Sequence, residues 1–153
     1  MKVLTVLVPT YNVEKYLRRC LDSLLLPEVL EEIEVLVVND GSKDGSADIA
    51  RAYEKKYPQT VVFVDKENGG HGSTINVGIE KAQGTYFKVL DSDDWVNIGD
   101  FIEFVKRLKE ETADAVICDY RKEHVYNGKS EYFEYKDLED GKKYNLNEID
   151  LNI

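Results

Sequence analysis

Short, mostly apolar runs alternate with helically spaced apolar stripes along the first 118 residues. The runs indicate strands; they cover residues 3–8, 33–38, 61–64, 85–90 and 113–118. The first run is continuous and rich in β-branched residues, which predicts a strand that is buried on both faces. The stripes repeat every three or four positions, as in amphipathic helices; they cover residues 13–25, 47–57, 73–82 and 99–110. This alternation predicts an α/β fold, with a mostly parallel sheet and helices on both of its faces.

Several residues are expected to mark the ends of these elements. Pro9 should end the ladder of the first strand because it lacks an amide hydrogen. Asn12 should cap the first helix, and Gly84 should end the third helix in a left-handed conformation. Residues 121–136 alternate around Asn127-Gly128, which predicts a C-terminal β-hairpin with a two-residue turn. We therefore expect a core at 1–118, with the hairpin and the start of a further part at 119–153.

Composition and charge narrow the classes of function. The chain has 153 residues, of which 42% are hydrophobic and 33% charged, as in a folded domain. The net charge of −10 argues against a nucleic-acid-binding surface. Cys20 and Cys118 lie in apolar patterns and are expected to be buried thiols of a reducing compartment. Since no signal peptide is visible, the cytoplasm is the expected location.

Four successive strands are followed by unusual loops. These are PTYN at 9–12, NDGS at 39–42, DKENGG at 65–70 and DSDD at 91–94. The carboxyl ends of parallel strands share one edge of a sheet, which is where open α/β sheets bind their ligands. We therefore expect the four loops to converge on one site.

The loop DSDD places three carboxylates within four positions. In an extended backbone Asp91 and Asp93 would lie on one side and Asp94 on the other. Two bare carboxylates side by side repel each other, so we expect Mn²⁺ or Mg²⁺ between them. The alternative is that the acidic residues serve the next helix, with Asp94 or Asp100 as its cap.

The other loops offer contacts for a nucleotide, each with a plainer alternative. Tyr11 could stack on a nucleobase or pack on its own helix. Asp40 could accept a hydrogen bond from a base or ribose, or only close a turn. A calcium loop starting at Asp40 is excluded because Arg51 stands where such a loop needs a glutamate. The glycines before the third helix favour an anion, and His71 could contact its phosphate or simply be solvated.

In order and spacing, VPTYNVEKYLRRCLDSLL, VVNDGSKDGS, ENGG and LDSDDW resemble the nucleotide-sugar-binding half of family 2 glycosyltransferases, which have the GT-A fold. The resemblance covers residues 2–118 and contains a DXD motif, Asp-Ser-Asp. It implies that Asp91 and Asp93 hold Mn²⁺ or Mg²⁺, with Asp93 favoured as the direct ligand. The implied substrate-binding residues are Pro9, Tyr11, Asp40, Asn68, Gly69, Asp91 and Ser92. A nucleotidyltransferase would need a glycine-rich loop with an arginine after the first strand, which PTYN is not.

Enzymes of this family transfer a sugar from a nucleotide diphosphate, here expected to be UDP, to an acceptor hydroxyl. The resemblance implies a glycan or lipid-linked acceptor, a role in polysaccharide synthesis and a place at the inner face of the cell membrane. The chain departs from the family at Asn39, often an aspartate, and at Ile75, often an arginine. The general base is expected to lie beyond the end of this chain. The 153 residues would then bind a donor without transferring its sugar.

Overall fold

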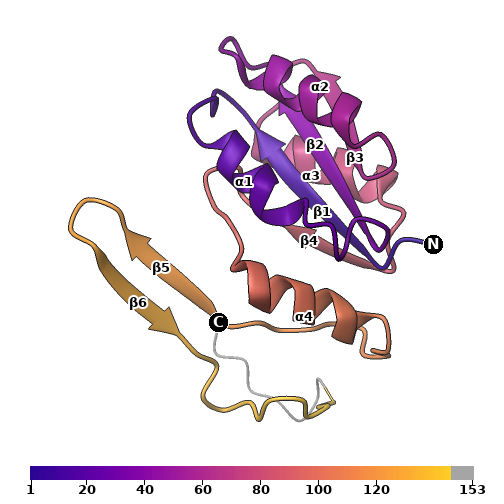
Figure 1. The fold of residues 1–153 in the computed structure, drawn as a ribbon, viewed down its shortest axis with the longest axis vertical. Helices are drawn as coiled ribbons and strands as arrows, with labels where there is room; N and C mark the ends of the chain where they lie inside the picture. Colours follow the sequence, from indigo (N-terminus) through magenta and orange to yellow (C-terminus); the bar gives the residue numbers. More distant parts are fainter. Residues whose placement is uncertain (146–153) are drawn as a thin grey trace. The chain divides into compact units, whose positions relative to one another are not determined.

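The computed structural model describes residues 1–145, and the chain divides into two compact units, Met1–Glu111 and Thr112–Ile153. The first unit alternates strands and helices (Figure 1). Its elements are β1 (Leu4–Thr10), α1 (Leu17–Leu24), β2 (Ile33–Asp40), α2 (Ser46–Lys56), β3 (Val61–Lys66), α3 (His71–Lys81), β4 (Tyr86–Val89) and α4 (Ile98–Leu108). The second unit contains β5 (Tyr120–His124) and β6 (Lys129–Phe133).

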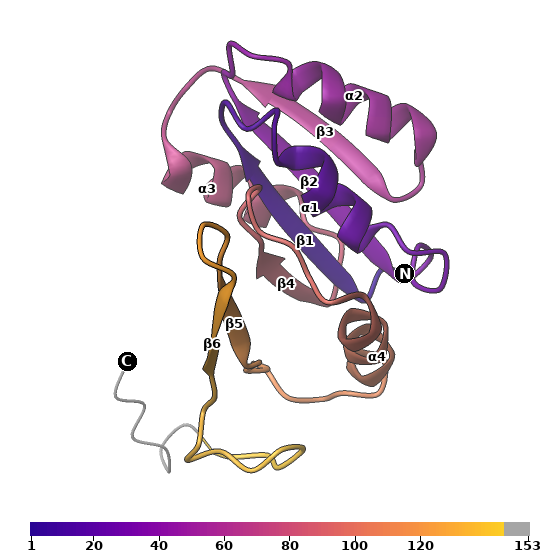
Figure 2. The ribbon, with the colours of Figure 1, turned by 60° about the vertical axis from the view of Figure 1, so that its left-hand side comes forward.

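The first unit is built on a parallel sheet of four strands in the order β3-β2-β1-β4. Helices α1, α2 and α4 cover one face and α3 covers the other (Figure 2). This confirms the predicted α/β fold with helices on both faces. The central strands β1 and β2 are buried along their whole length, which was predicted for β1 from its apolar run. The burial of β2 includes the charged residue Glu34.

Side chains that alternate along β1 supply two separate hydrophobic clusters. Val6 and Val8 pack in the larger cluster, under α1, α2 and α4. Leu7 points to the other face, where Ile75 and Val77 of α3 pack against it and its neighbours on β2. The sheet thereby holds the ends of β1 and β2 in a fixed relation to both helix layers.

The first strand does not end at Pro9, as the sequence predicted, but continues to Thr10. The carbonyls of Val3 and Leu7 accept hydrogen bonds from the β4 side. Pro9, two residues further along, therefore faces that side too. The ladder with β4 ends at Val89, opposite Leu7, so no partner strand needs the missing amide hydrogen.

Two predicted helix boundaries are also wrong. α1 begins at Leu17, and Asn12 does not cap it. Asn12 adopts a left-handed φ of 51°, and its side chain accepts from the amide of Lys43 instead. Gly84 is not in the left-handed region. It is required because a Cβ atom at this position would lie 2.4 Å from the amide nitrogen of Thr5.

Residues 113–118, the expected fifth strand, do not form a strand. Val116 and Ile117 are 41% and 45% exposed, and Cys118 is exposed as well, whereas Cys20 is buried as expected. An apolar run becomes a strand only where another strand offers an edge to pair with. Among residues 1–145 the run meets no such edge.

The second unit contains the predicted hairpin. β5 and β6 pair antiparallel, and Tyr120 stacks on Phe133 with ring centroids 4.7 Å apart. The turn is longer than predicted, because His124 pairs with Lys129 and leaves residues 125–128 as a four-residue loop. Three acidic side chains of this unit contact other residues of the unit. Asp119 accepts from the amide of Tyr135, Glu123 contacts Arg121 and Ser130, and Glu131 contacts His124.

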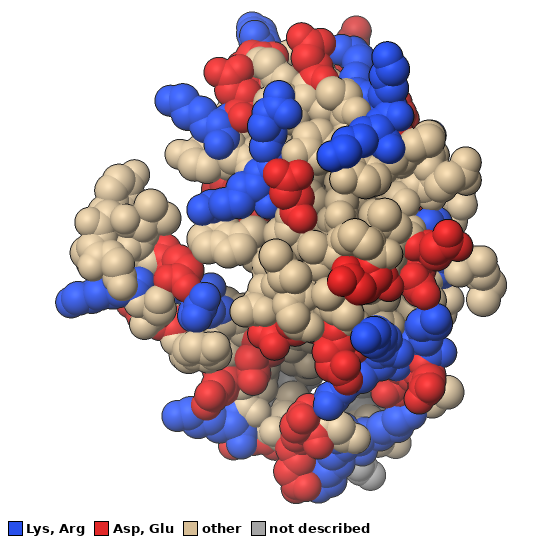
Figure 3. All heavy atoms as spheres, viewed as in Figure 1, with Lys and Arg blue, Asp and Glu red and all other residues tan. Residues whose placement is uncertain are grey.

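The surface over α1 and α2 has Lys and Arg interspersed with Asp and Glu rather than a continuous basic patch (Figure 3). Within residues 1–145, no helix has both the length and the apolar character needed to cross a membrane.

Candidate functional site

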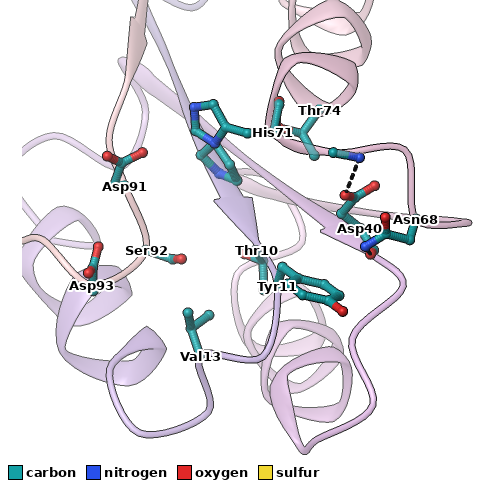
Figure 4. A pocket seen from close by; sticks show the side chains of 12 residues that line it. Thr10, Tyr11, Val13, Asp40, Asn68, His71, Thr74, Asp91, Ser92 and Asp93 are labelled. Carbon is teal, nitrogen blue, oxygen red and sulfur yellow. Dashed lines mark hydrogen bonds between the residues drawn. The ribbon is translucent and has the colours of Figure 1, made fainter.

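The four loops predicted to converge do so at the carboxyl edge of the sheet, around a cavity of about 410 Å³ (Figure 4). Each strand end of the sheet contributes to its lining. The lining residues are Pro9, Thr10, Tyr11, Val13, Asp40, Asn68, Gly70, His71, Thr74, Asp91, Ser92 and Asp93. All the residues that the sequence analysis proposed for binding substrate or metal line this cavity, with the exception of Gly69. The amide of Gly69 donates a hydrogen bond to the lining residue Asp40.

Asp40 organises one side of the cavity. Its carboxylate accepts hydrogen bonds from the amides of Gly69 and Gly70, both at 2.8 Å, and from the ammonium of Lys66. The amide side chain of Asn68 donates to the Asp40 carbonyl at 3.1 Å. Burial by itself would raise the pKa of Asp40, but the bonds from Lys66 and the two glycine amides outweigh it and hold the pKa below its ordinary value. Asp40 therefore stays charged and ties the glycine-rich loop to the end of β2.

Lys66 is the part of this arrangement that the sequence did not suggest. Its side chain is 21% exposed and bonds Asp40, the Ser73 hydroxyl at 2.8 Å and the Glu67 carbonyl at 2.6 Å. No motif marks it, but Asp40 and Lys66 are direct partners in the β2–β3 register. Only a known register could have found the pair.

The loop after β1 is tied to the loop after β2 by reciprocal hydrogen bonds. Asn12 donates its amide to the Ser42 hydroxyl at 3.0 Å and accepts from the amide of Lys43 at 2.8 Å. Glu14 repeats the pattern, since its amide donates to Asp44 and its carboxylate accepts from the amide of Gly45 at 2.7 Å.

Ser46 completes this set of contacts by accepting from the amide of Val13 at 2.9 Å. The polar residues of the second loop thus hold the loop after β1. Tyr11 lies in this loop and lines the cavity, and 49% of the residue is exposed.

Residues Asp91–Asp94 form a turn, not the extended segment that the sequence analysis assumed. The Asp94 amide donates to the Asp91 carbonyl at 2.9 Å. Asp91 and Asp93 nevertheless both line the cavity, with the buried Ser92 between them, whereas Asp94 does not line it. Asp94 is also not the cap of the next helix: Asn97 is, and its side chain accepts from the amide of Asp100.

Two side chains of helix α1 donate hydrogen bonds to backbone carbonyls of this acidic turn. The Cys20 thiol donates to the Asp91 carbonyl at 3.8 Å, and burial raises its pKa to about 12, so it remains a donor. Arg19 donates to the Asp93 carbonyl at 3.4 Å, and its guanidinium lies 3.6 Å from the centre of the Trp95 ring. Burial, followed by the charges of Asp93 and Asp91, raises the pKa of Asp94, while Arg19 opposes this.

The family model for glycosyl transferase family 2 matches residues 5–149. The chain belongs to this family. The putative glycosyltransferase EpsH of Bacillus subtilis (strain 168) is 41% identical over 126 residues, which are 82% of this chain and 36% of EpsH. The chain thus spans about a third of the length of this family 2 relative.

Solved structures agree with this assignment and show that the fold is GT-A. Residues 1–349 of S. aureus TarS, in complex with UDP-GlcNAc, match with a TM-score of 0.58 and 33% identity, over 72% of this chain and 32% of that chain. The mannosyltransferase PcManGT of Pyrobaculum calidifontis, in complex with GDP-Man and Mn²⁺, matches with a TM-score of 0.60 and 27% identity, over 67% of this chain and 31% of that chain.

The acidic turn suits the divalent metal that the family resemblance implies. Asp91 and Asp93 present two carboxylates to one cavity, and hard cations such as Mn²⁺ and Mg²⁺ prefer oxygen ligands. Within residues 1–145, no three His, Cys, Asp or Glu side chains are grouped so as to hold a metal by themselves. The pair therefore fits an ion that takes its remaining ligands from water or from a bound phosphate.

Proposed function

We propose that this chain is the donor-binding part of a glycosyltransferase and that its cavity binds a nucleotide-diphosphate sugar, with a UDP-sugar as the first candidate. The observation that carries the proposal is the meeting of Tyr11, Asp40 and the Asp91–Asp93 pair around one cavity at the carboxyl edge of the sheet. TarS and PcManGT, which share the fold, were solved with UDP-GlcNAc and GDP-Man.

Each side of the cavity then has a role in holding the donor. Tyr11 would face the base, and Asp40 and Asn68 would position the nucleoside and the glycine-rich loop. Asp91 and Ser92 would contact the ribose and diphosphate, and Asp91 and Asp93 would hold Mn²⁺ or Mg²⁺. When bound, the metal would offset negative charge on the leaving diphosphate.

In the transfer itself, the acceptor oxygen forms a bond to the anomeric carbon, and the bond from that carbon to the diphosphate oxygen breaks. The nucleoside diphosphate leaves with the electron pair, and the hydroxyl proton passes to a general base. We propose that the acceptor is a glycan or lipid-linked sugar in polysaccharide synthesis. We also propose that the full-length enzyme works in the cytoplasm, where it could dock on the inner face of the cell membrane.

A second candidate is nucleotide-sugar binding without transfer by these 153 residues. The carboxylates that line the cavity are those of Asp40, Asp91 and Asp93. Each is assigned to the donor or the metal, which leaves none of them to deprotonate an acceptor. We therefore expect that a sugar-transfer assay on the chain fails, and efficient transfer would eliminate this candidate.

Calorimetry with UDP, with and without Mn²⁺, tests the proposed function. We expect binding that strengthens in Mn²⁺, because Asp91 and Asp93 would hold the metal and its charge would offset that of the diphosphate. Asp93→Ala should lower the affinity to the level without metal. Asp94→Ala is the matched control, since Asp94 is the neighbouring carboxylate that does not line the cavity. If neither UDP nor GDP binds in either condition, the proposal is wrong.

A further inference from the structure

We propose that His71 is the side chain of this cavity that contacts the diphosphate of the donor. The inference rests on the proposed function and deepens it by naming the protein group that recognises the phosphates. Among the lining residues, His71 is the only one whose side chain can carry a positive charge, and the charged side chains around it are those of Asp40, Asp91 and Asp93.

The backbone before His71 is held in place, so the position of the ring is defined. His71 is the first residue of α3, and the preceding Gly70 has φ 86° and ψ 166°, a conformation that side chains rarely allow. The amides of Gly69 and Gly70 are bonded to the buried carboxylate of Asp40. Figure 4 shows the His71 ring extending from the start of α3 toward the side of the cavity where Asp91 lies.

The His71 ring is available to a ligand, whereas the ammonium group of Lys66 is not. Across residues 1–145, the ring takes part in no hydrogen bond or ion pair, and the residue is exposed. Lys66 is engaged with Asp40, Ser73 and the Glu67 carbonyl. Of His71 and Lys66, His71 is therefore the one whose side chain is free to contact a phosphate in the cavity.

His71 also accounts for the departure at Ile75, where the family often has an arginine. Residues 71 and 75 are one helical turn apart and lie on the same face of α3. Ile75 packs against the sheet residues Leu7, Leu36 and Val38, so this position contributes to the core. The residue one turn earlier stands beyond the strand ends, at the cavity, and there the chain has a histidine.

The charges of the cavity explain why such a contact would matter. Asp91, Asp93 and a donor diphosphate together bring four negative charges, and one divalent ion offsets two of them. An imidazole N–H donates a hydrogen bond to a phosphate oxygen, and its protonated form also adds a positive charge. The contact would strengthen as the diphosphate leaves and gains charge.

The test compares UDP with uridine, which has the same base and ribose but no phosphate. UDP binding in Mn²⁺ is measured by calorimetry and uridine binding by ligand-observed NMR, for the full chain and three variants. His71→Ala should lower UDP affinity about tenfold, as expected for a lost hydrogen bond to a charged group, and leave uridine affinity unchanged. His71→Arg should restore UDP binding to within about threefold of wild type. His124→Ala, on β5 of the other unit, is the matched control and should change neither ligand.

Three outcomes would overturn the inference. One is that His71→Ala binds UDP as tightly as wild type. Another is that it loses UDP and uridine affinity equally, which would show a structural role instead of a phosphate contact. The third is that the wild-type protein binds no UDP at all, which would reject the proposed function together with the inference. This outcome is distinguished from the other two because it is seen in the wild-type protein and needs no variant.

Discussion

At the scale of single residues, the carboxylate of Asp40 has the most demanding environment of the site. Its side chain is only 5% exposed, and it accepts from Lys66 and from the amides of two successive glycines. A buried carboxylate with this many donors is stable only while all of them are in place. Asp40 thus has a structural role in addition to any contact with the nucleoside.

We predict that Asp40→Asn lowers the free energy of unfolding by about 2 kcal/mol. The side chain would keep one acceptor oxygen, its NH₂ group would face the amide of Gly69 or Gly70, and Lys66 would lose its charged partner. Urea denaturation followed by circular dichroism measures the change. Asp65→Asn is the control: Asp65 pairs with Arg51 at the surface, where both side chains are about half exposed, so its loss should cost under about 1 kcal/mol. Equal losses in the two variants would contradict the role of Asp40.

The same residue should give stability a specific dependence on pH. The pKa of Asp40 is lower in the folded protein than its ordinary value of 3.8. Its contribution is therefore complete above that value and is lost as the pH falls through the lowered pKa. We expect the stability difference between wild type and Asp40→Asn to be constant from neutral pH to about pH 5 and to shrink below pH 4. Denaturation curves across this range test it, and a difference that grows on acidification would contradict it.

At the scale of elements, the loops after β1 and β2 behave as one unit, because Asn12 and Glu14 exchange hydrogen bonds with residues 42–45. Asn12 has a left-handed φ of 51°, which alanine adopts less readily than asparagine and glycine. The contacts hold the backbone beside Tyr11. The sequence alone excluded a calcium loop starting at Asp40 and offered no other reason for the polar residues at 42–45. Their contacts with Asn12 and Glu14 provide that reason.

We predict that Asn12→Ala destabilises the protein by about 1–2 kcal/mol, from the strained φ and the lost bond to Lys43. Asn12→Gly removes the same side chain but relieves the φ, so it should cost less. Both variants should weaken UDP binding, because the loop that carries Tyr11 loosens. Thermal denaturation and calorimetry provide the two readouts. A glycine variant that is less stable than the alanine variant would rule out the backbone argument.

The acidic turn after β4 depends in a similar way on α1, through Cys20 and Arg19. Trp95, the single tryptophan of the chain, stacks under Arg19 and therefore reports on this turn. We predict that Mn²⁺ with UDP changes the tryptophan emission, because the carboxylates proposed to hold the metal, those of Asp91 and Asp93, lie in the neighbouring turn.

Arg19→Ala should shift the emission of the free protein and lower its stability by about 1 kcal/mol, the order of a partly exposed cation–π contact. Arg107→Ala on α4 is the control for the emission: it removes a cation that pairs with Glu103 on the same helix and should leave the emission unchanged. Fluorescence titration and urea denaturation measure both effects. Unchanged emission in Arg19→Ala would show that the stacking does not persist in solution.

At the scale of the whole molecule, the lining residues identified among residues 1–145 belong to the first unit, Met1–Glu111. The clusters that support the sheet also lie within this unit. We therefore expect the first unit to bind the proposed donor without residues 112–153.

We predict that a protein ending at Glu111 folds and binds UDP with Mn²⁺ within about threefold of the full chain, a difference of less than 1 kcal/mol. Circular dichroism and calorimetry test this directly. Loss of binding in a shortened protein that still melts cooperatively would show that the second unit takes part in the donor site.

Much of the first unit could be predicted from sequence, because each strand and helix carries its own periodicity. The runs of β1 and β2 and the stripe of α4 are local patterns, and burial preserves them. The prediction of a fifth strand at residues 113–118 was wrong because pairing is not a local property. These residues have the composition of a strand, but a strand also needs the edge of another strand to pair with, and composition cannot supply one. Pro9 was misjudged because its tolerance depends on where β4 ends, a property of the register.

By itself, the sequence determined the alternation of elements, the parallel sheet and the set of loops at its carboxyl edge, because these follow from the spacing of apolar residues and from the chirality of the chain. Only the tertiary structure decided which residues hold the site together. Lys66 meets Asp40 through strand register, Asn12 meets Lys43 across 31 positions, and His71 reaches the cavity because α3 starts beyond the strand ends. Such contacts depend on distances between elements, and no local pattern encodes them.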